Sequence, residues 1–180
     1  PSARVTMKVT KRNGATEPVD VNKIVRAVER SARDLPDVDP LRIATKTISG
    51  LYDGATTEEL DKLSIRTASE LIGEEPSYSL LAARLLSNVI SKEVRNQGVH
   101  SFSQSVRFGH QLGQISDVTA EFVEQHDRKL NDAIDTDGDL KFEYFGMRTI
   151  YDRYLLRHPQ TRRVIETPQY FMLRVACGLS

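Results

Sequence analysis

The chain of 180 residues contains a single cysteine, Cys177. One thiol excludes an internal disulfide and a cysteine-rich zinc site, and it is typical of a reducing compartment. The sequence also lacks net charge, because lysine plus arginine and aspartate plus glutamate number 25 each. This balance argues against the overall positive field of a general nucleic-acid-binding protein.

Long apolar runs are also missing. No segment approaches the roughly 18 apolar residues that are needed to span a bilayer, and residues 1–7 lack the apolar stretch of a secretory signal. Internal repeats and low-complexity tracts are absent as well. From these absences we expect a soluble, cytoplasmic protein.

Charge is nevertheless uneven along the chain, because residues 1–33 hold eight basic side chains against three acidic ones. Several of the basic residues surround the turn signal Asn13-Gly14. Asn-Gly supplies the two positive-φ positions of a two-residue hairpin turn. The pattern therefore predicts two short strands, residues 8–12 and 17–21, with Lys11 and Arg12 at the strand end beside the turn.

A capped helix is expected directly after this hairpin. Asp20 or Asn22 can accept a hydrogen bond from the first helical turn, which carries Lys23, and Arg26 follows one turn later on the same face. A helix N-terminus presents unpaired N–H groups and the positive end of the helix dipole. The hairpin and the helix start together predict a site for a polyphosphate.

The rest of the sequence follows the 3.6-residue period of amphipathic helices. The expected helices span residues 24–35, 39–51, 56–72, 77–96, 103–112, 119–130, 143–155 and 168–179. We predict a mainly α fold in which a four-helix bundle is capped by the short strands, forming a domain over residues 1–97. A second, incomplete helical domain would cover residues 98–180. Because the last segment is apolar to its end, we expect the N-terminal part of a longer protein or one half of a split one.

Two blocks of the sequence resemble one protein family. Residues 9–24 are similar to the ATP cone, a small regulatory nucleotide-binding domain at the N-terminus of ribonucleotide reductases and in a related transcriptional repressor. Residues 144–154 and 166–172 are similar to the segment that follows the cone in the large subunit of class I ribonucleotide reductase. The blocks occur in the family's order. The repressor joins its cone to a zinc ribbon, for which a single cysteine is too few.

The resemblance implies a set of residues that bind an effector nucleotide, ATP or dATP, with Mg²⁺. Basic side chains would hold the phosphates, the segment 17–22 would line the nucleotide, and a threonine would donate a hydrogen bond from the start of the third helix. The implied residues are Lys11, Arg12, Glu17, Pro18, Val19, Asp20, Val21, Asn22, Lys23, Arg26, Thr57 and Lys92.

Two alternatives to this site remain open from the residues themselves. The cations could form an ordinary solvated basic surface. Glu17 is unfavourable beside a polyphosphate unless it faces the adenosine end or a bound Mg²⁺, and it could instead pair with Lys11 or Arg12 across the hairpin.

Other motifs favour structural interpretations. Residues 135–139 have the acidic character of a calcium loop but not its spacing, so a polar turn is expected there. The arginines and tyrosines of residues 144–163 fit core and interface positions. Cys177 lies in an apolar helix without a partner thiol, and the four histidines lack metal-ligand spacing. We name no catalytic residue and no metal ligand in this chain.

The resemblance implies the regulatory N-terminal region of a ribonucleoside-diphosphate reductase large subunit. Such an enzyme works with a smaller radical-generating subunit, and its large subunit forms oligomers. The cone would act as the overall activity switch in deoxyribonucleotide synthesis. The alternative is a free-standing nucleotide-sensing module without catalytic activity.

Overall fold

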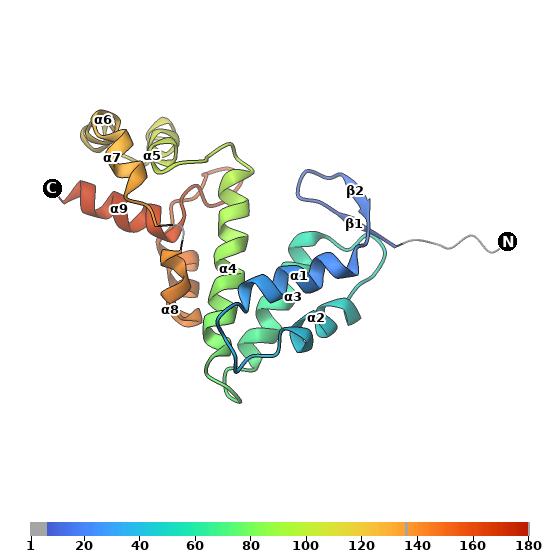
Figure 1. Cartoon of the computed structure of the whole chain (residues 1–180). Coiled ribbons are helices and arrows are strands. Elements are labelled where there is room, and N and C mark those ends of the chain that lie inside the picture. The colour runs from blue at the N-terminus through green and yellow to red at the C-terminus, as the bar shows by residue number, and fades with distance from the viewer. Residues whose placement is uncertain (1–6, 136, 180) are drawn as a thin grey trace. The chain divides into compact units, whose positions relative to one another are not determined.

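The computed structural model describes residues 7–135 and 137–179 (Figure 1). The described chain is mainly α-helical, with one two-stranded antiparallel sheet near its N-terminus, which confirms the predicted fold class. It divides into two compact units, the first up to Leu85 and the second from Leu86 onward. The dividing point lies within the longest helix, so the domain boundary predicted at residues 97–98 stays a prediction.

The first unit contains the hairpin and three complete helices, and it includes the first part of a fourth helix. The elements are β1 (Lys8–Thr10), β2 (Thr16–Pro18), α1 (Val21–Ser31), α2 (Pro40–Ser49), α3 (Thr57–Glu70) and α4 (Tyr78–Arg95). The strands are shorter than predicted, and α1 ends at Ser31 rather than near Leu35.

Each complete helix of this unit begins at a side-chain cap. Asp20 accepts a hydrogen bond from the N–H of Lys23, which decides between the two caps considered for α1. Asp39 caps α2 in the same way. Thr56 caps α3 and forms a reciprocal capping box with Glu59.

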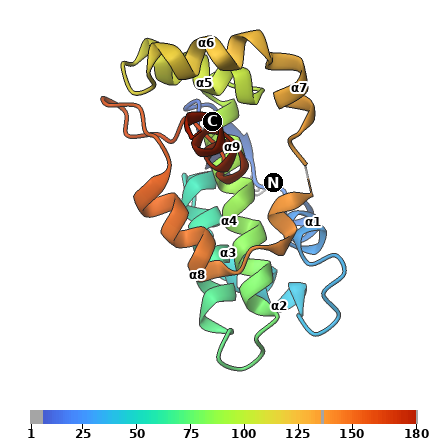
Figure 2. The same ribbon diagram turned by 90° about the vertical axis from the view of Figure 1, so that its left-hand side faces the viewer.

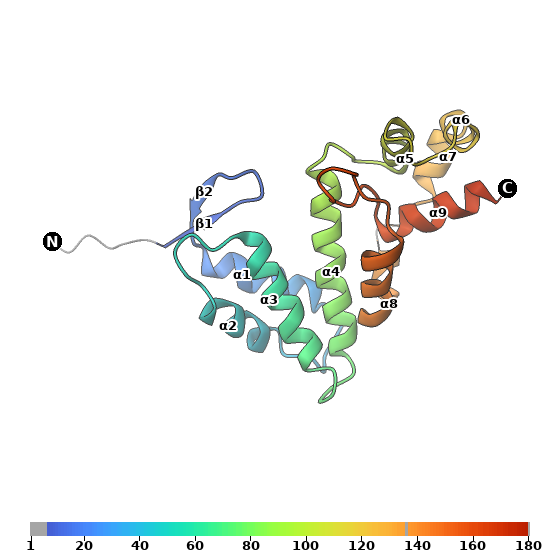
Figure 3. The ribbon, with the colours of Figure 1, turned by 180° about the vertical axis from the view of Figure 1, so that it is seen from behind.

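The core of the first unit lies between the helices. α1 packs against α2 and α2 against α3, as Figure 3 shows from behind. Ile43 of α2 is fully buried, and Val28 of α1 is 2% exposed. Thr47 and Ser64 join α2 to α3 by a buried hydrogen bond of 2.8 Å between their hydroxyls. This packing fixes the positions of the helix starts and of the hairpin that lies against them.

The hairpin turn differs from the prediction. Gly14 alone has positive φ, at 83°, and its N–H donates to the Lys11 carbonyl, while the Lys11 N–H donates to the Ala15 carbonyl. The loop therefore holds three residues, a turn followed by a glycine in the left-handed region. Because Asn13 keeps a negative φ and its side chain accepts from the Ala15 N–H, Arg12 lies within the loop rather than at the strand end.

The segment between α2 and α3 fastens the hairpin to the bundle. The Thr10 N–H donates to the Ala55 carbonyl at 2.9 Å, and Thr10 forms a parallel bridge with Thr56. The Lys8 N–H donates to the Asp53 carboxylate at 2.9 Å. These contacts bring the N-terminus of α3 beside β1, although the two segments lie more than 40 residues apart in the chain.

The second unit continues from α4 with short helices. The elements are α5 (Phe102–Gln111), α6 (Asp117–Gln125), α7 (Asp127–Asp132), η1 (Gly138–Lys141), α8 (Tyr144–Thr149), the π-helical turn η2 (Ile150–Tyr154) and α9 (Pro168–Gly178). The acidic turn predicted at residues 135–139 contains Thr136, which lies outside the described residues, and η1 begins within it at Gly138.

The single helix predicted over residues 119–130 is wrong. His126 interrupts it with non-helical backbone angles and separates α6 from α7. Its ring Nδ1 lies 2.9 Å from the Phe122 carbonyl, the acceptor that a continuing helix would use. A local side-chain bond of this kind competes with the helical hydrogen bond.

The apolar core of the second unit centres on Phe102, which is 1% exposed. Val106, Ile115 and Val123 complete its buried cluster, and residues of α9 pack against it. Figure 2 shows α5, α6 and α9 grouped in this way. Tyr154 is 57% exposed, and its ring stacks on that of Phe171 with 6.0 Å between the centroids. Among residues 7–135 and 137–179, no helix is both long and apolar enough to cross a membrane.

Candidate functional site

Two lysines and one carboxylate meet beside the hairpin. The Lys11 Nζ lies 2.8 Å from one Glu17 carboxylate oxygen, and the Lys23 Nζ lies 3.4 Å from the other. Hydrogen bonding from Lys11, supported by the charges of both lysines, lowers the pKa of Glu17 below its usual 4.5. Glu17 thus pairs with Lys11, as the alternative interpretation expected, and it also pairs with Lys23. Its carboxylate marks a point between two cations where another anion can be held.

Arg12 is directed toward α3. Its Nη2 lies 3.2 Å from the Asp61 carboxylate and its Nη1 lies 4.0 Å from that of Glu58, and its side chain is only 13% exposed. The three-residue loop makes this possible because it carries Arg12 over the first turns of α3. Arg12 therefore ties the hairpin tip to α3 and lies less open to a ligand than Lys11, whose side chain is 44% exposed.

The N-terminus of α1 contributes backbone donors to the same place. Asp20 caps the Lys23 N–H, and its second carboxylate oxygen lies 3.7 Å from Arg26 Nη2. The N–H groups of Val21 and Asn22 precede the first possible intrahelical acceptor, as in any helix start. Both residues are exposed, so the N-terminal end of α1, with its positive dipole end, lies at the surface beside Lys23.

The other predicted residues lie around this centre in different ways. Pro18 ends β2 opposite Lys8, and the Val19 N–H donates to the Met7 carbonyl, so both serve the hairpin through their backbone. Thr57 opens α3 and is half-buried, and its hydroxyl makes no hydrogen bond within the described part of the chain. Lys92 is exposed on the part of α4 that belongs to the second unit, and its contact with a nucleotide stays a prediction.

Two acidic residues of this region are not among those predicted from the sequence. Glu58 and Asp61 lie one turn apart on α3 and hold Arg12. Their i, i+3 spacing was visible in the sequence and indicates a shared face. Nothing local indicated which cation they would meet, because Asp61 and Arg12 are separated by 49 positions.

Outside this region, the described residues favour neither metal binding nor thiol reactivity. No group of three histidine, cysteine, aspartate or glutamate side chains in residues 7–135 and 137–179 could hold a metal ion. Cys177 is half-buried against the Phe102 cluster, and burial raises the pKa of its thiol. A raised pKa disfavours the reactive thiolate at neutral pH.

Two family models match the chain. The ATP cone domain matches residues 7–93, a range that includes the hairpin and the starts of α1 and α3. The all-alpha domain of ribonucleotide reductase matches residues 140–180, which include α8 and α9.

Curated relatives match nearly the whole chain. The ribonucleoside-diphosphate reductase large subunit of Caenorhabditis elegans is 36% identical over 179 residues, covering 95% of this chain and 22% of the relative. Its counterpart from Monkeypox virus is 33% identical, covering 96% of this chain and 23% of the relative. The Arabidopsis thaliana protein of the same name is 33% identical, with coverages of 96% and 22%. The chain thus spans less than a quarter of the length of these relatives, and with its ATP cone and the beginning of an all-alpha domain it belongs to the family of ribonucleoside-diphosphate reductase large subunits.

Proposed function

We propose that the first unit binds ATP and dATP as allosteric effectors and thereby controls the overall activity of a cytoplasmic ribonucleoside-diphosphate reductase. The enzyme would supply deoxyribonucleotides for DNA replication. The observation that carries the proposal is the Glu17 carboxylate, which bridges Lys11 and Lys23 beside the N-terminus of α1. A carboxylate held by two cations stands in for a phosphate group of the effector.

The ion pairs at this site suit exchange with a ligand. Glu17, Lys11 and Lys23 are all at least 32% exposed, and solvent screening makes such exposed ion pairs weak. A triphosphate carries more charge than one carboxylate, and it can also accept from the N–H groups of Val21 and Asn22. The triphosphate would therefore replace Glu17 between the lysines, while Arg26 adds a forked donor.

Glu17 would then turn toward the adenosine end of the nucleotide or toward Mg²⁺. Of the two carboxylates among the predicted residues, Asp20 is committed to capping α1, so Glu17 is the one that is free to change partner. Carboxylate and phosphate oxygens are the ligands that Mg²⁺ prefers, so Glu17 fits a shared role in holding the ion. Bound Mg²⁺ would neutralise part of the phosphate charge.

Discrimination between ATP and dATP has to come from contacts around the 2′-hydroxyl, because the two ligands carry the same triphosphate. The hydroxyl of Thr57 and the side chain of Asn22 are polar groups of this site that the hairpin and bundle leave available. An effector shifts an equilibrium only by its differential affinity for the two states. We propose that dATP favours an inhibited assembly in which the cone contacts the radical-generating subunit or another large subunit.

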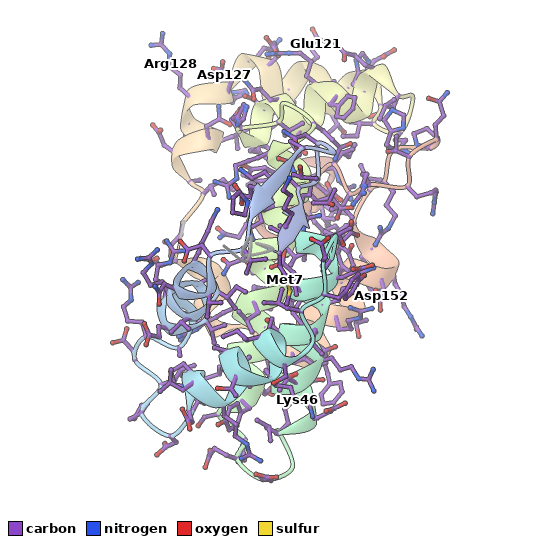
Figure 4. All side chains as sticks on the ribbon, turned by 90° about the vertical axis from the view of Figure 1, so that its right-hand side faces the viewer. Met7, Lys46, Glu121, Asp127, Arg128 and Asp152 are labelled. Carbon is purple, nitrogen blue, oxygen red and sulfur yellow. The ribbon has the colours of Figure 1, made fainter. Side chains whose placement is uncertain are left out.

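The test replaces both lysines at once. In the Lys11→Ala, Lys23→Ala double variant, calorimetric titration should show affinity for ATP and for dATP lowered together by about tenfold or more, because both lose charge-assisted contacts. The far-ultraviolet circular dichroism should not change. The matched control is Lys46→Ala with Lys62→Ala, which removes two exposed charges from α2 and α3; Lys46 is labelled on α2 in Figure 4. Undiminished binding by the Lys11/Lys23 variant would remove the site assignment.

A further inference from the structure

Four basic side chains form a stripe along the outer face of α1. Lys23, Arg26 and Arg30 lie on the helix, and Arg33 lies in the turn that follows it. Successive members are three, four and three residues apart, the spacing that places side chains on one helical face. At a rise of 1.5 Å per residue the stripe extends over about 15 Å. We call these four residues the α1 stripe.

The α1 stripe surrounds a hollow of about 620 Å³. The lining consists of the four basic side chains and Glu29, so the net charge around the hollow is positive. Arg26 and Arg33 are 66% and 71% exposed, and their carboxylate partners Asp20 and Asp34 lie at long distances of 3.7 and 3.9 Å. Such pairs are weak and leave the guanidinium groups able to bind another anion.

Arg30 lies in the middle of the stripe and has no ion-pair or hydrogen-bond partner from its side chain within residues 7–135 and 137–179. Arg30 is exposed, and it lines the same hollow as Arg26 and Arg33. Three arginines in a row offer a series of forked donors, a geometry that matches phosphate oxygens.

From this geometry we infer that the α1 stripe binds a linear chain of phosphate groups longer than a triphosphate. The lining residues are four basic side chains and Glu29, with no aromatic or aliphatic side chain among them. A row of cations along one helical face favours a ligand that is negatively charged along its whole length. Repeating phosphates meet that requirement, and a stripe of about 15 Å accommodates several of them.

This site overlaps the proposed nucleotide site but does not depend on it. Lys23 and Arg26 belong to both, whereas Arg30 and Arg33 belong only to the α1 stripe. The last two residues therefore distinguish the sites. A phosphate chain held along α1 would compete with an effector nucleotide for Lys23 and Arg26.

The test uses medium-chain inorganic polyphosphate as the probe, with the whole 180-residue chain titrated by calorimetry. The Arg30→Gln, Arg33→Gln variant should bind polyphosphate about tenfold more weakly, while its affinity for ATP stays within about twofold of the original. The matched control is Lys46→Gln with Arg66→Gln, which removes two exposed positive charges from α2 and α3. This control should change polyphosphate binding by less than about twofold, because it leaves the stripe intact.

Several results would overturn the inference. These are a failure of the original chain to bind polyphosphate, equal losses in the Arg30/Arg33 variant and its control, or binding of poly-glutamate as tight as that of polyphosphate at the same charge. Equal loss of ATP and polyphosphate binding in the Arg30/Arg33 variant would also overturn it, since the two sites would then be one. Polyphosphate binding without ATP binding would support the stripe and refute the proposed nucleotide site.

Discussion

Carboxylates in the two units of this chain have different environments. In the first unit, Glu17 bridges two lysines beside the hairpin and is 32% exposed. In the second unit, Glu166 is 1% exposed, and it accepts hydrogen bonds from both Nε and Nη2 of Arg174 and from the Leu156 N–H. Glu93, 6% exposed, accepts from the Tyr151 hydroxyl. An exposed ion pair contributes little free energy, so a ligand can replace one of its members at small cost. A buried carboxylate that loses its partners keeps an uncompensated charge inside the protein, which destabilises the fold. The comparison separates Glu17, whose exposed partners can be exchanged, from Glu166 and Glu93, whose buried carboxylates are held by partners within the second unit.

The largest effect is expected from Glu166. Glu166→Ala leaves Arg174 and the Leu156 N–H without their acceptor, and the free energy of unfolding should fall by about 3 kcal/mol. Denaturant unfolding followed by circular dichroism measures this loss. Asp152→Ala, which removes an exposed i, i+4 partner of Arg148, should cost less than about 0.5 kcal/mol. A cost for Glu166→Ala as small as that of the control would abolish the distinction between buried and exposed carboxylates.

The ion pair of Arg12 is intermediate in burial between the pairs of Glu166 and Asp152. The Arg12 side chain is 13% exposed, and that of its partner Asp61 is 27% exposed. Arg12→Ala should lower the free energy of unfolding by about 1 kcal/mol, since solvent screens part of the pairing. The same unfolding measurement applies, with Lys62→Ala as the control for an exposed partner of Glu58. If the two variants lose the same amount, Arg12 does not fasten the hairpin to α3.

Replacing Glu17 tests whether an anionic ligand can take the place of its carboxylate between Lys11 and Lys23. Glu17→Gln frees Lys11 and Lys23, so inorganic triphosphate without Mg²⁺ should bind about threefold more tightly, a gain in the range of one surface ion pair. Calorimetry measures the change, and Glu70→Gln removes an equal charge from an exposed site on α3 as the control. Binding of ATP with Mg²⁺ should gain less, because Glu17 then loses its own role. Weaker triphosphate binding by Glu17→Gln would show that the carboxylate does not compete with phosphate.

The smallest effect concerns acid stability. Hydrogen bonds from Lys11 and from Tyr52 lower the pKa values of Glu17 and Glu59, respectively, below 4.5 in the folded chain. The unfolded chain then takes up these protons first, so the stabilisation is present above pH 4.5 and is lost as the pH falls through the lowered values. Thermal unfolding across this range should show a shallower acid decline for Glu17→Gln. An unchanged decline would mean that the pairing of Glu17 does not stabilise the fold.

Helix starts were the most predictable features of the fold. Asp39 and Thr56 cap α2 and α3, and Asp20 is one of the two caps considered for α1. These contacts join residues two or three positions apart, so the sequence contains them directly. The break at His126 was missed because the surrounding apolar spacing continues through it, and the competing bond to Phe122 depends on a side-chain conformation.

The candidate nucleotide site was predictable in part, because some of its residues are also near neighbours in the chain. Lys23 and Arg26 share a face because helical spacing requires it. The position of Arg12 was not predictable, because an Asn-Gly pair is compatible with either a two-residue or a three-residue loop, and the two place Arg12 differently.

The amino-acid sequence by itself determined the mainly helical fold, the helix caps and the concentration of basic residues near the N-terminus. All three follow from composition or from contacts between near neighbours in the chain. Only the tertiary structure decided which carboxylate meets which cation: Glu17 with Lys11 and Lys23, and Asp61 with Arg12. The physical reason for the Asp61–Arg12 pairing is that the loop geometry and the docking of β1 beside α3 join residues 49 positions apart, which no local pattern encodes. The pairings of Glu17 are short in sequence, but only the folded hairpin and the start of α1 select its partners among the neighbouring cations.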